Sequence, residues 1–108
     1  MRGHLDLLLL QVLSAGPAHG YAVITALRER SDGAFDLPEG TVYPALHRLE
    51  DAGLLASVWA RVDGRRRRLY ELTPAGRAAV RAERREWRTL VDAVNTVLQG
   101  PVVTGARL

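Results

Sequence analysis

An Asp-Gly pair, Asp63-Gly64, separates two short segments in a chain whose other apolar residues mostly follow helical spacing. Residues 54–62 before the pair change toward a period of two, and residues 65–72 follow it as a return segment. Asp-Gly is a preferred two-residue turn between antiparallel strands, because both of its positions can adopt positive φ. The sequence therefore predicts one β-hairpin, and the fold class is mainly α with a small β-hairpin.

Four helices are predicted around this hairpin. Residues 4–15 are almost all apolar, so this helix must be covered on more than one side. A second helix over 19–30 places Tyr21, Ile24 and Leu27 on one face. After a short turn, a third helix runs to about residue 52, with Asp36 or Gly40 as its N-cap.

The fourth helix begins at Thr73-Pro74, a capping threonine followed by proline at the first helical position, and continues to residue 98 or 99. Helices two and three, joined by a short turn and followed by a hairpin, form a winged helix-turn-helix. We therefore expect a winged helix-turn-helix domain over residues 1–73, a C-terminal dimerisation helix over 74–100 and a disordered tail over 101–108.

The composition indicates a single domain that works without a cofactor. The chain has 108 residues, 47% of them hydrophobic, and no cysteine. The apolar run 7–10 is too short to span a bilayer, and no cleavage site follows it, so we expect a cytoplasmic protein with no membrane partner. His4, His19 and His47 lack metal-site spacing. No catalytic constellation is recognisable either, so we predict no metal site, no cofactor and no enzyme.

Positive charge is concentrated between Arg61 and Arg88. This segment holds ten arginines and four acidic residues, a net charge of +6, whereas the whole chain has +3 and the remainder therefore −3. Such a basic segment indicates a polyanionic partner. Within it, Glu83 and Glu86 stand among Arg81, Arg84, Arg85 and Arg88, and we expect ordinary ion pairs on a solvated helix face.

Five motifs carry a resemblance to a known family over residues 5–98. They are His19-Gly20-Tyr21, the segment Gly40–Glu50 (GTVYPALHRLE), Gly53-Leu54-Leu55, Gly64-Arg65 and the segment Tyr70–Gly76 (YELTPAG). On these residues the chain resembles the PadR family of bacterial transcriptional regulators, in its shorter branch with a single C-terminal helix. Wings of that family often carry two successive aromatic residues before Leu-Thr-Pro, whereas this chain has Leu69 at the first of them.

The resemblance favours contact with double-stranded DNA through the outer face of the third helix and through the wing. By surface composition alone, the helix face fits solvated polar residues equally well. Alternate residues of a strand share a face, so Arg65 and Arg67 should point one way and Arg66 and Arg68 the other. The expected DNA-binding residues are His19, Tyr21, Thr41, Tyr43, Pro44, His47, Arg48, Arg65, Arg66, Arg67, Arg68 and Tyr70. For His19, a phosphate contact and a structural capping role both remain open.

An apolar seam on the fourth helix recurs every three or four residues and needs a partner helix. The first helix can supply it, from its own chain and from a second subunit. The expected dimerisation residues are Leu8, Val12, Trp87, Leu90, Val91, Val94, Val97 and Leu98. The resemblance also implies a ligand role for Trp87, because a tryptophan at the similar place in the multidrug-sensing branch stacks aromatic ligands. A plain core role for Trp87 remains the alternative.

Two hypotheses for the function follow. The first is a homodimeric repressor that binds a palindromic operator and is released by a small aromatic effector. The second is an architectural or protein-interaction winged-helix module without a specific operator.

Overall fold

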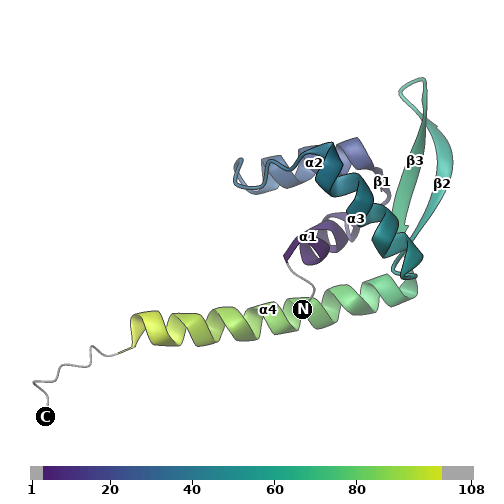
Figure 1. Ribbon diagram of the computed structural model, residues 1–108. Helices are drawn as coiled ribbons and strands as arrows, with labels where there is room; N and C mark the ends of the chain where they lie inside the picture. Colours follow the sequence, from purple (N-terminus) through teal and green to yellow (C-terminus); the bar gives the residue numbers. More distant parts are fainter. Residues whose placement is uncertain (1–3, 101–108) are drawn as a thin grey trace, which may run out of the picture.

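The computed structural model describes residues 4–100 and contains four helices and a three-stranded antiparallel sheet within that range (Figure 1). The elements are α1 (His4–Leu13), β1 (Ala18–His19), α2 (Gly20–Arg30), α3 (Glu39–Asp51), β2 (Leu55–Val62), β3 (Arg65–Leu72) and α4 (Pro74–Gln99). The predicted fold class, a mainly α winged helix-turn-helix with a long C-terminal helix, is confirmed. The predicted disordered tail, 101–108, lies outside the described residues.

The hairpin of β2 and β3 turns at the predicted pair. Asp63 has φ of 50° and Gly64 has φ of 76°, so both central positions are left-handed, as a type I′ turn requires. The strands pair in continuous register from Val62 opposite Arg65 to Leu55 opposite Leu72. The two-residue strand β1 adds to the other edge of β3 and gives the order β1-β3-β2; the sequence pattern did not predict it, because two residues are too few to show alternation.

Helix α4 begins as predicted and is anchored to the base of the hairpin. The Thr73 hydroxyl accepts a hydrogen bond from the backbone N–H of Gly76 at 3.0 Å and donates one to the Gly53 carbonyl at 2.6 Å. Gly76 lies so close to the Leu54 carbonyl that a Cβ would overlap it. These contacts fix the direction in which α4 leaves the winged domain.

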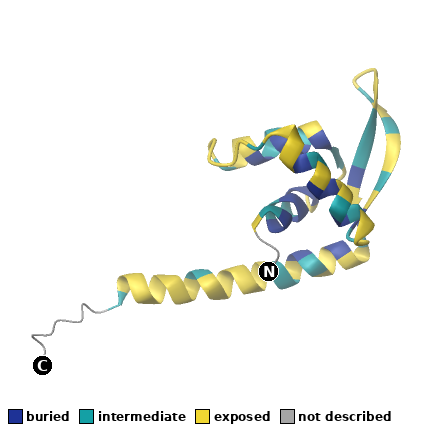
Figure 2. Ribbon diagram, viewed as in Figure 1, coloured by how far each residue is buried: buried dark blue, intermediate teal, exposed yellow. Residues whose placement is uncertain are grey.

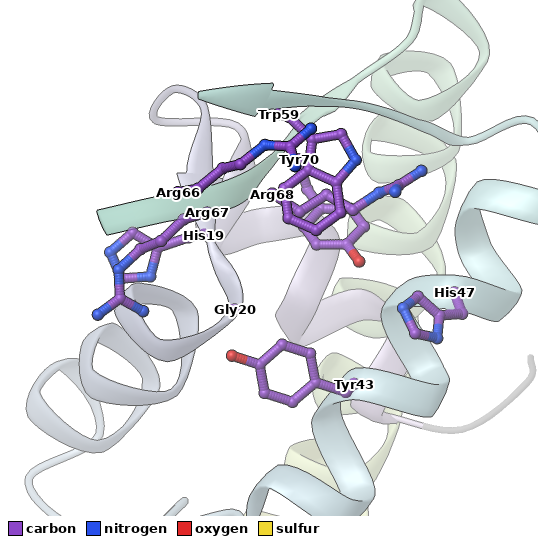
Figure 3. A pocket seen from close by; sticks show the side chains of 9 residues that line it. All are labelled: His19, Gly20, Tyr43, His47, Trp59, Arg66, Arg67, Arg68 and Tyr70. Carbon is purple, nitrogen blue, oxygen red and sulfur yellow. The ribbon is translucent and has the colours of Figure 1, made fainter. Parts of the chain in front are cut away.

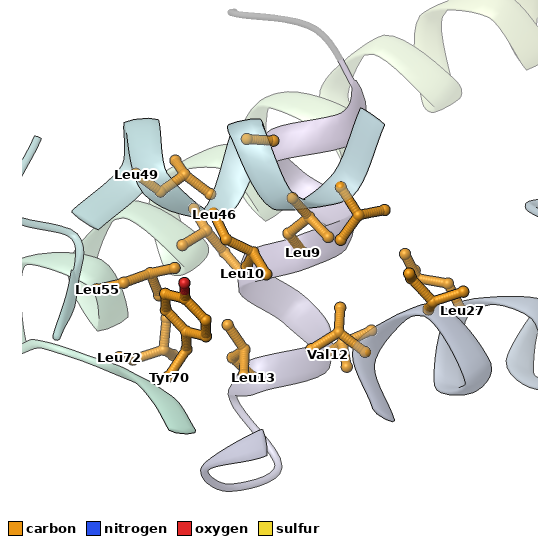
Figure 4. Close-up of a cluster of buried hydrophobic side chains, with 14 of the residues drawn as sticks. Leu9, Leu10, Val12, Leu13, Leu27, Leu46, Leu49, Leu55, Tyr70 and Leu72 are labelled. Atoms are coloured by element: carbon orange, nitrogen blue, oxygen red, sulfur yellow. The ribbon is translucent and has the colours of Figure 1, made fainter. Parts of the chain in front are cut away.

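The core is built around α1, which is covered by α2, α3, α4 and β3 (Figures 2 and 4). Leu9, Leu10 and Leu13 are fully buried there, which confirms that this helix is covered on more than one side. The prediction that Tyr21 lies on the buried face of α2 is wrong, because its side chain is 55% exposed. The helix instead buries Val23, together with the expected Ile24 and Leu27, since these residues face α1 and α3.

The start of α3 differs from the prediction. Its N-cap is Pro38, without a side-chain hydrogen bond, rather than Asp36 or Gly40. Residues 31–38 connect α2 to α3, a longer connection than the short turn expected. Because the helix already begins at Glu39, Pro44 falls in its second turn, where it cannot donate the usual bond to the Gly40 carbonyl.

Candidate nucleic-acid interface

A cleft of about 290 Å³ lies between α3 and the β2–β3 hairpin (Figure 3). Its walls come from the start of α2, from one face of α3 and from the arginine-rich part of the hairpin. The lining residues are His19, Gly20, Tyr43, His47, Trp59, Arg66, Arg67, Arg68 and Tyr70. Three segments far apart in sequence thus combine donors, cations and aromatic rings in one concave surface, the combination that nucleic-acid backbones bind.

Two of the hairpin arginines, Arg66 and Arg68, contact specific partners in the hairpin and in α3. The guanidinium carbon atoms of Arg66 and Arg68 lie 4.6 Å and 5.4 Å from the centre of the Trp59 ring, as cation–π contacts. Arg68 also donates from Nε to the Ser57 hydroxyl at 2.7 Å, and its Nη2 lies 3.7 Å from a Glu50 carboxylate oxygen. These contacts confirm that Arg66 and Arg68 share a face.

His19 caps α2, which settles one of its two predicted roles. Its Nδ1 accepts a hydrogen bond from the backbone N–H of Ala22 at 3.2 Å. Burial first, and the charge of Arg67 second, lower the pKa of His19, so the ring is neutral at neutral pH. A neutral ring that accepts at Nδ1 carries its proton on Nε2, and this N–H can donate to a phosphate. The phosphate contact itself stays a prediction.

Tyr43 is positioned by a glycine. A Cβ at position 20 would overlap the Tyr43 ring, so only glycine lets this ring pack against the start of α2. His47 lies one turn further along α3, exposed, with its ring 6.4 Å from that of Tyr70. Thr41 and Pro44 are also exposed on α3. All five predicted contact residues of α3, Arg48 included, are thus accessible at least in part.

Tyr70 does not belong to the DNA-contacting set that the sequence predicted. Its side chain is 1% exposed and packs in the core with Leu55 and Leu72 (Figure 4). Burial is also the main cause that raises the pKa of Tyr70. The reason is strand alternation: Tyr70 and Leu72 are two positions apart on the strand, with one residue between them, so both face inward. Tyr70 therefore forms the floor of the cleft.

Arg48, one of the predicted DNA-contacting residues, is bound by a partner within its own chain, and its contact with DNA stays a prediction. Its two Nη atoms donate to the two carboxylate oxygens of Asp6, at 2.7 Å and 3.0 Å, and this hydrogen bond raises the pKa of Arg48. Asp6 is 5% exposed, so the pair ties α3 to α1. From α4, Glu83 faces the same place: burial, then the Asp6 carboxylate, raise the pKa of Glu83.

The remaining arginines of the hairpin differ in accessibility. Arg65 is exposed beside the turn, and Arg67 is half-buried next to His19, with its Nε buried and without a hydrogen-bond partner in the structure. Sequence reasoning missed Trp59 as a functional residue. The turn position would have revealed it, because a two-residue turn at 63–64 places Trp59 opposite Arg68.

The apolar seam of α4 is exposed along its second half. Trp87 is 40% exposed and Leu90, Val94, Val97 and Leu98 are exposed as well, whereas Val91 is half-buried. The His4 ring packs edge-on against Trp87 at 5.0 Å, next to a cleft of about 350 Å³. In α1, Leu8 is half-buried, but Val12 is buried in the core of its own chain, which corrects its assignment to a dimer contact.

Residues 4–100 contain neither a candidate metal site nor a candidate membrane-spanning helix. No group of three or more His, Cys, Asp or Glu side chains in this range could hold a metal ion. No helix of the same range is long and apolar enough to cross a membrane.

Comparison with known proteins gives consistent matches. Residues 9–82 match the transcriptional regulator PadR-like family. Over 67 residues the chain is 49% identical to the transcriptional regulator Rv3488 of Mycobacterium tuberculosis; the match covers 62% of this chain and 63% of that relative, less than two thirds of its length.

Solved structures are similar over most of the chain. A PadR family transcription regulator from Clostridium difficile R20291 has a TM-score of 0.80 and 34% identity, covering 89% of this chain and 99% of that one. A PadR family transcriptional regulator from Eggerthella lenta DSM 2243 has a TM-score of 0.77 and 35% identity, covering 93% and 86%.

Proposed function

This chain belongs to the PadR-like family of transcriptional regulators, and we propose that it acts as a homodimeric repressor on a palindromic operator. As a member of this family it is a DNA-binding regulator and not an enzyme. Repression by occupying an operator would also place the protein in the cytoplasm.

The observation that carries this proposal is the cleft between α3 and the hairpin. A major groove admits one helix, so Thr41, Pro44 and His47 would meet base edges, with Tyr43 at a phosphate or the groove wall. Arg65 to Arg68 would neutralise phosphates beside that groove or enter a minor groove. His19 Nε2 and the exposed Tyr21 would bind the backbone at the start of α2.

A homodimer would supply the second recognition helix. Two such helices must lie about 34 Å apart to reach successive major grooves on one side of the duplex. The exposed apolar residues of α4, from Trp87 to Leu98, are the surface we assign to this contact. Covering them with a second copy would remove an apolar face from water, the main favourable term in association.

A small aromatic molecule is the effector we propose, bound at Trp87. The exposed Trp87 ring and the adjacent cleft of about 350 Å³ support this site. An offset-stacked ring pair contributes ~0.5–1.5 kcal/mol beyond burial. A ligand with higher affinity for the dimer in which the recognition helices have the wrong spacing would shift the population toward it and release the operator.

Selection of DNA fragments tests the operator assignment. Purified protein is incubated with randomised duplexes, and the retained fragments are sequenced. We expect an inverted repeat whose half-sites lie about one helical turn apart, and a His47→Ala variant should lose preference at one position in each half-site. The matched control is Arg30→Ala, at the end of α2. Retained fragments without a shared motif would instead support the architectural module.

Fluorescence tests the effector assignment. In a Trp59→Phe background Trp87 is the only tryptophan, so planar aromatic compounds that stack on it should quench the tryptophan emission. The same compounds should weaken operator binding by the wild-type protein. The proposal fails if no compound in a broad panel quenches Trp87 and if Trp87→Ala destabilises the dimer as a plain core truncation does.

A further inference from the structure

A second group of arginines lies on α4, away from the cleft. Arg77, Arg81, Arg84, Arg85 and Arg88 recur at spacings of three and four, which places them along one side of the helix; we name them the α4 stripe. All five are exposed, and the last four line one open cleft of about 210 Å³. The stripe extends over about 17 Å of helix.

The stripe has no acidic partners in the described part of the chain. The ion pairs found within residues 4–100 involve Arg28, Arg48 and Arg68 only, so the predicted pairing of α4 arginines with Glu83 and Glu86 is wrong. The reason is their spacing, because neither Glu83 nor Glu86 stands three or four residues from an arginine. The Oε2 atom of Glu83 is also buried and lacks a hydrogen-bond partner in the structure. Five like charges at helical spacing destabilise one another by a few tenths of a kcal/mol per pair.

The apolar seam of α4 borders the stripe, because Arg84 and Arg88 line the same cleft as Trp87 and Val91. Trp87, Leu90 and Val94 follow the same side as the buried Val80, whereas the stripe follows a separate side of the helix. A second subunit seated on the seam would leave Arg81 and Arg85, on the side of the stripe away from it, in water. Their charge therefore stays open to an anionic partner of another kind.

We propose that the α4 stripe binds the phosphate backbone of a second DNA segment, separate from the segment held by α3 and the hairpin. Guanidinium groups match phosphate oxygens with paired N–H donors. The stripe is linear and open rather than enclosed, which fits a row of phosphates along a strand better than a compact ligand. Figure 1 shows the hairpin tip pointing away from α4, the helix that carries the stripe.

Two sets of variants separate the surfaces without knowledge of any operator. The hairpin set is Arg66→Gln, Arg67→Gln and Arg68→Gln; the stripe set is Arg81→Gln and Arg85→Gln. Binding of a labelled random-sequence 20-bp duplex is followed by anisotropy from 50 to 200 mM salt, and circular dichroism verifies folding. The charge control adds Arg28→Gln and Arg30→Gln to the hairpin set.

The protein that carries the hairpin set alone should retain residual duplex binding. Its salt slope should be near −3, because about three phosphate contacts remain. Adding the stripe set should reduce this residual binding at least tenfold, whereas the charge control should change it less than twofold. Equal losses in the two combinations, or no residual binding by the folded hairpin set, would overturn the proposal. Inorganic tripolyphosphate that binds the stripe more tightly than DNA would also overturn it, in favour of a small polyanion.

Discussion

The hairpin and the α4 stripe carry the same charge in different structural settings. Residues 61–72 and residues 77–88 each contain five arginines and two acidic residues. In the hairpin, Arg66 and Arg68 rest on Trp59, and Arg68 is also fixed by Ser57 and Glu50. On α4 no ion pair within residues 4–100 holds any of the five arginines.

This difference shows that arginine density alone does not predict how a basic surface recognises DNA. Guanidinium groups held by neighbours lose little freedom when they bind, so they can select one geometry. Unheld groups lose more freedom, and they bind any backbone with strong salt dependence. We therefore expect the hairpin to contribute register and the stripe to contribute only attraction.

The largest expected effect separates the seam of α4 from its stripe. Val94→Glu places a charge in the apolar seam, where a second copy would have to bury it, so dimerisation and operator affinity should fall by at least 100-fold. Sedimentation and anisotropy measure the two losses. The control is Thr89→Glu, which adds the same charge off the seam. A Val94→Glu protein that remains dimeric would remove the seam from the interface.

The next effect compares a paired arginine with the unpaired ones. Arg48→Ala leaves Asp6 buried without its partner, so the free energy of unfolding should fall by about 1–3 kcal/mol, less than for a fully buried pair because Arg48 is partly exposed. Arg85→Ala should change it by less than about 0.5 kcal/mol. Urea titration measures both. Unchanged stability of Arg48→Ala with an altered base preference would support Arg48 as a DNA-contacting residue.

A smaller effect concerns one phosphate contact. Arg67→Ala should weaken binding to all duplexes alike and lower the salt slope by about one unit, because a single counterion-releasing contact is lost. A salt titration of operator and random duplexes measures the slope. Arg61→Ala, in the partner strand, is the comparison within the hairpin. An unchanged slope would show that Arg67 makes no phosphate contact.

The smallest effect is a pH dependence at Glu83. Burial raises the pKa of Glu83 in the folded chain. At pH values between the unfolded and the folded pKa, the folded state therefore binds more protons than the unfolded state. Stability should therefore fall as pH rises from the unfolded pKa through the folded one. Glu83→Gln should remove this fall and be the more stable protein at neutral pH. The control is Glu71→Gln, exposed on β3, which should leave this fall in place.

Local signals predicted the architecture well. Asp63-Gly64 located the turn, and Thr73-Pro74 located the start of α4, because both depend on backbone geometry that neighbouring residues determine. The almost wholly apolar α1 likewise predicted its central place in the core.

Most of the errors concern contacts between segments far apart in sequence. Arg48 lies on the polar side of α3, and nothing near it in sequence shows that Asp6, 42 residues away, binds it. The resemblance placed Tyr70 at DNA, whereas strand alternation from Leu72 places it in the core. The pairing of α4 charges failed for a different, local reason: Glu83 and Glu86 stand one, two or five residues from the nearby arginines rather than three or four.

The long overhang of α4 has a consequence for how the chain persists in the cell. Val80 is the last fully buried residue of this helix, although the helix continues to Gln99. In a lone chain, the amide protons of the overhang are protected mainly by local helical bonds, so they should exchange with solvent rapidly. Association would slow that exchange by mass action. Newly made chains at low abundance would thus offer proteases a frayed segment, and accumulation would protect the chain from degradation.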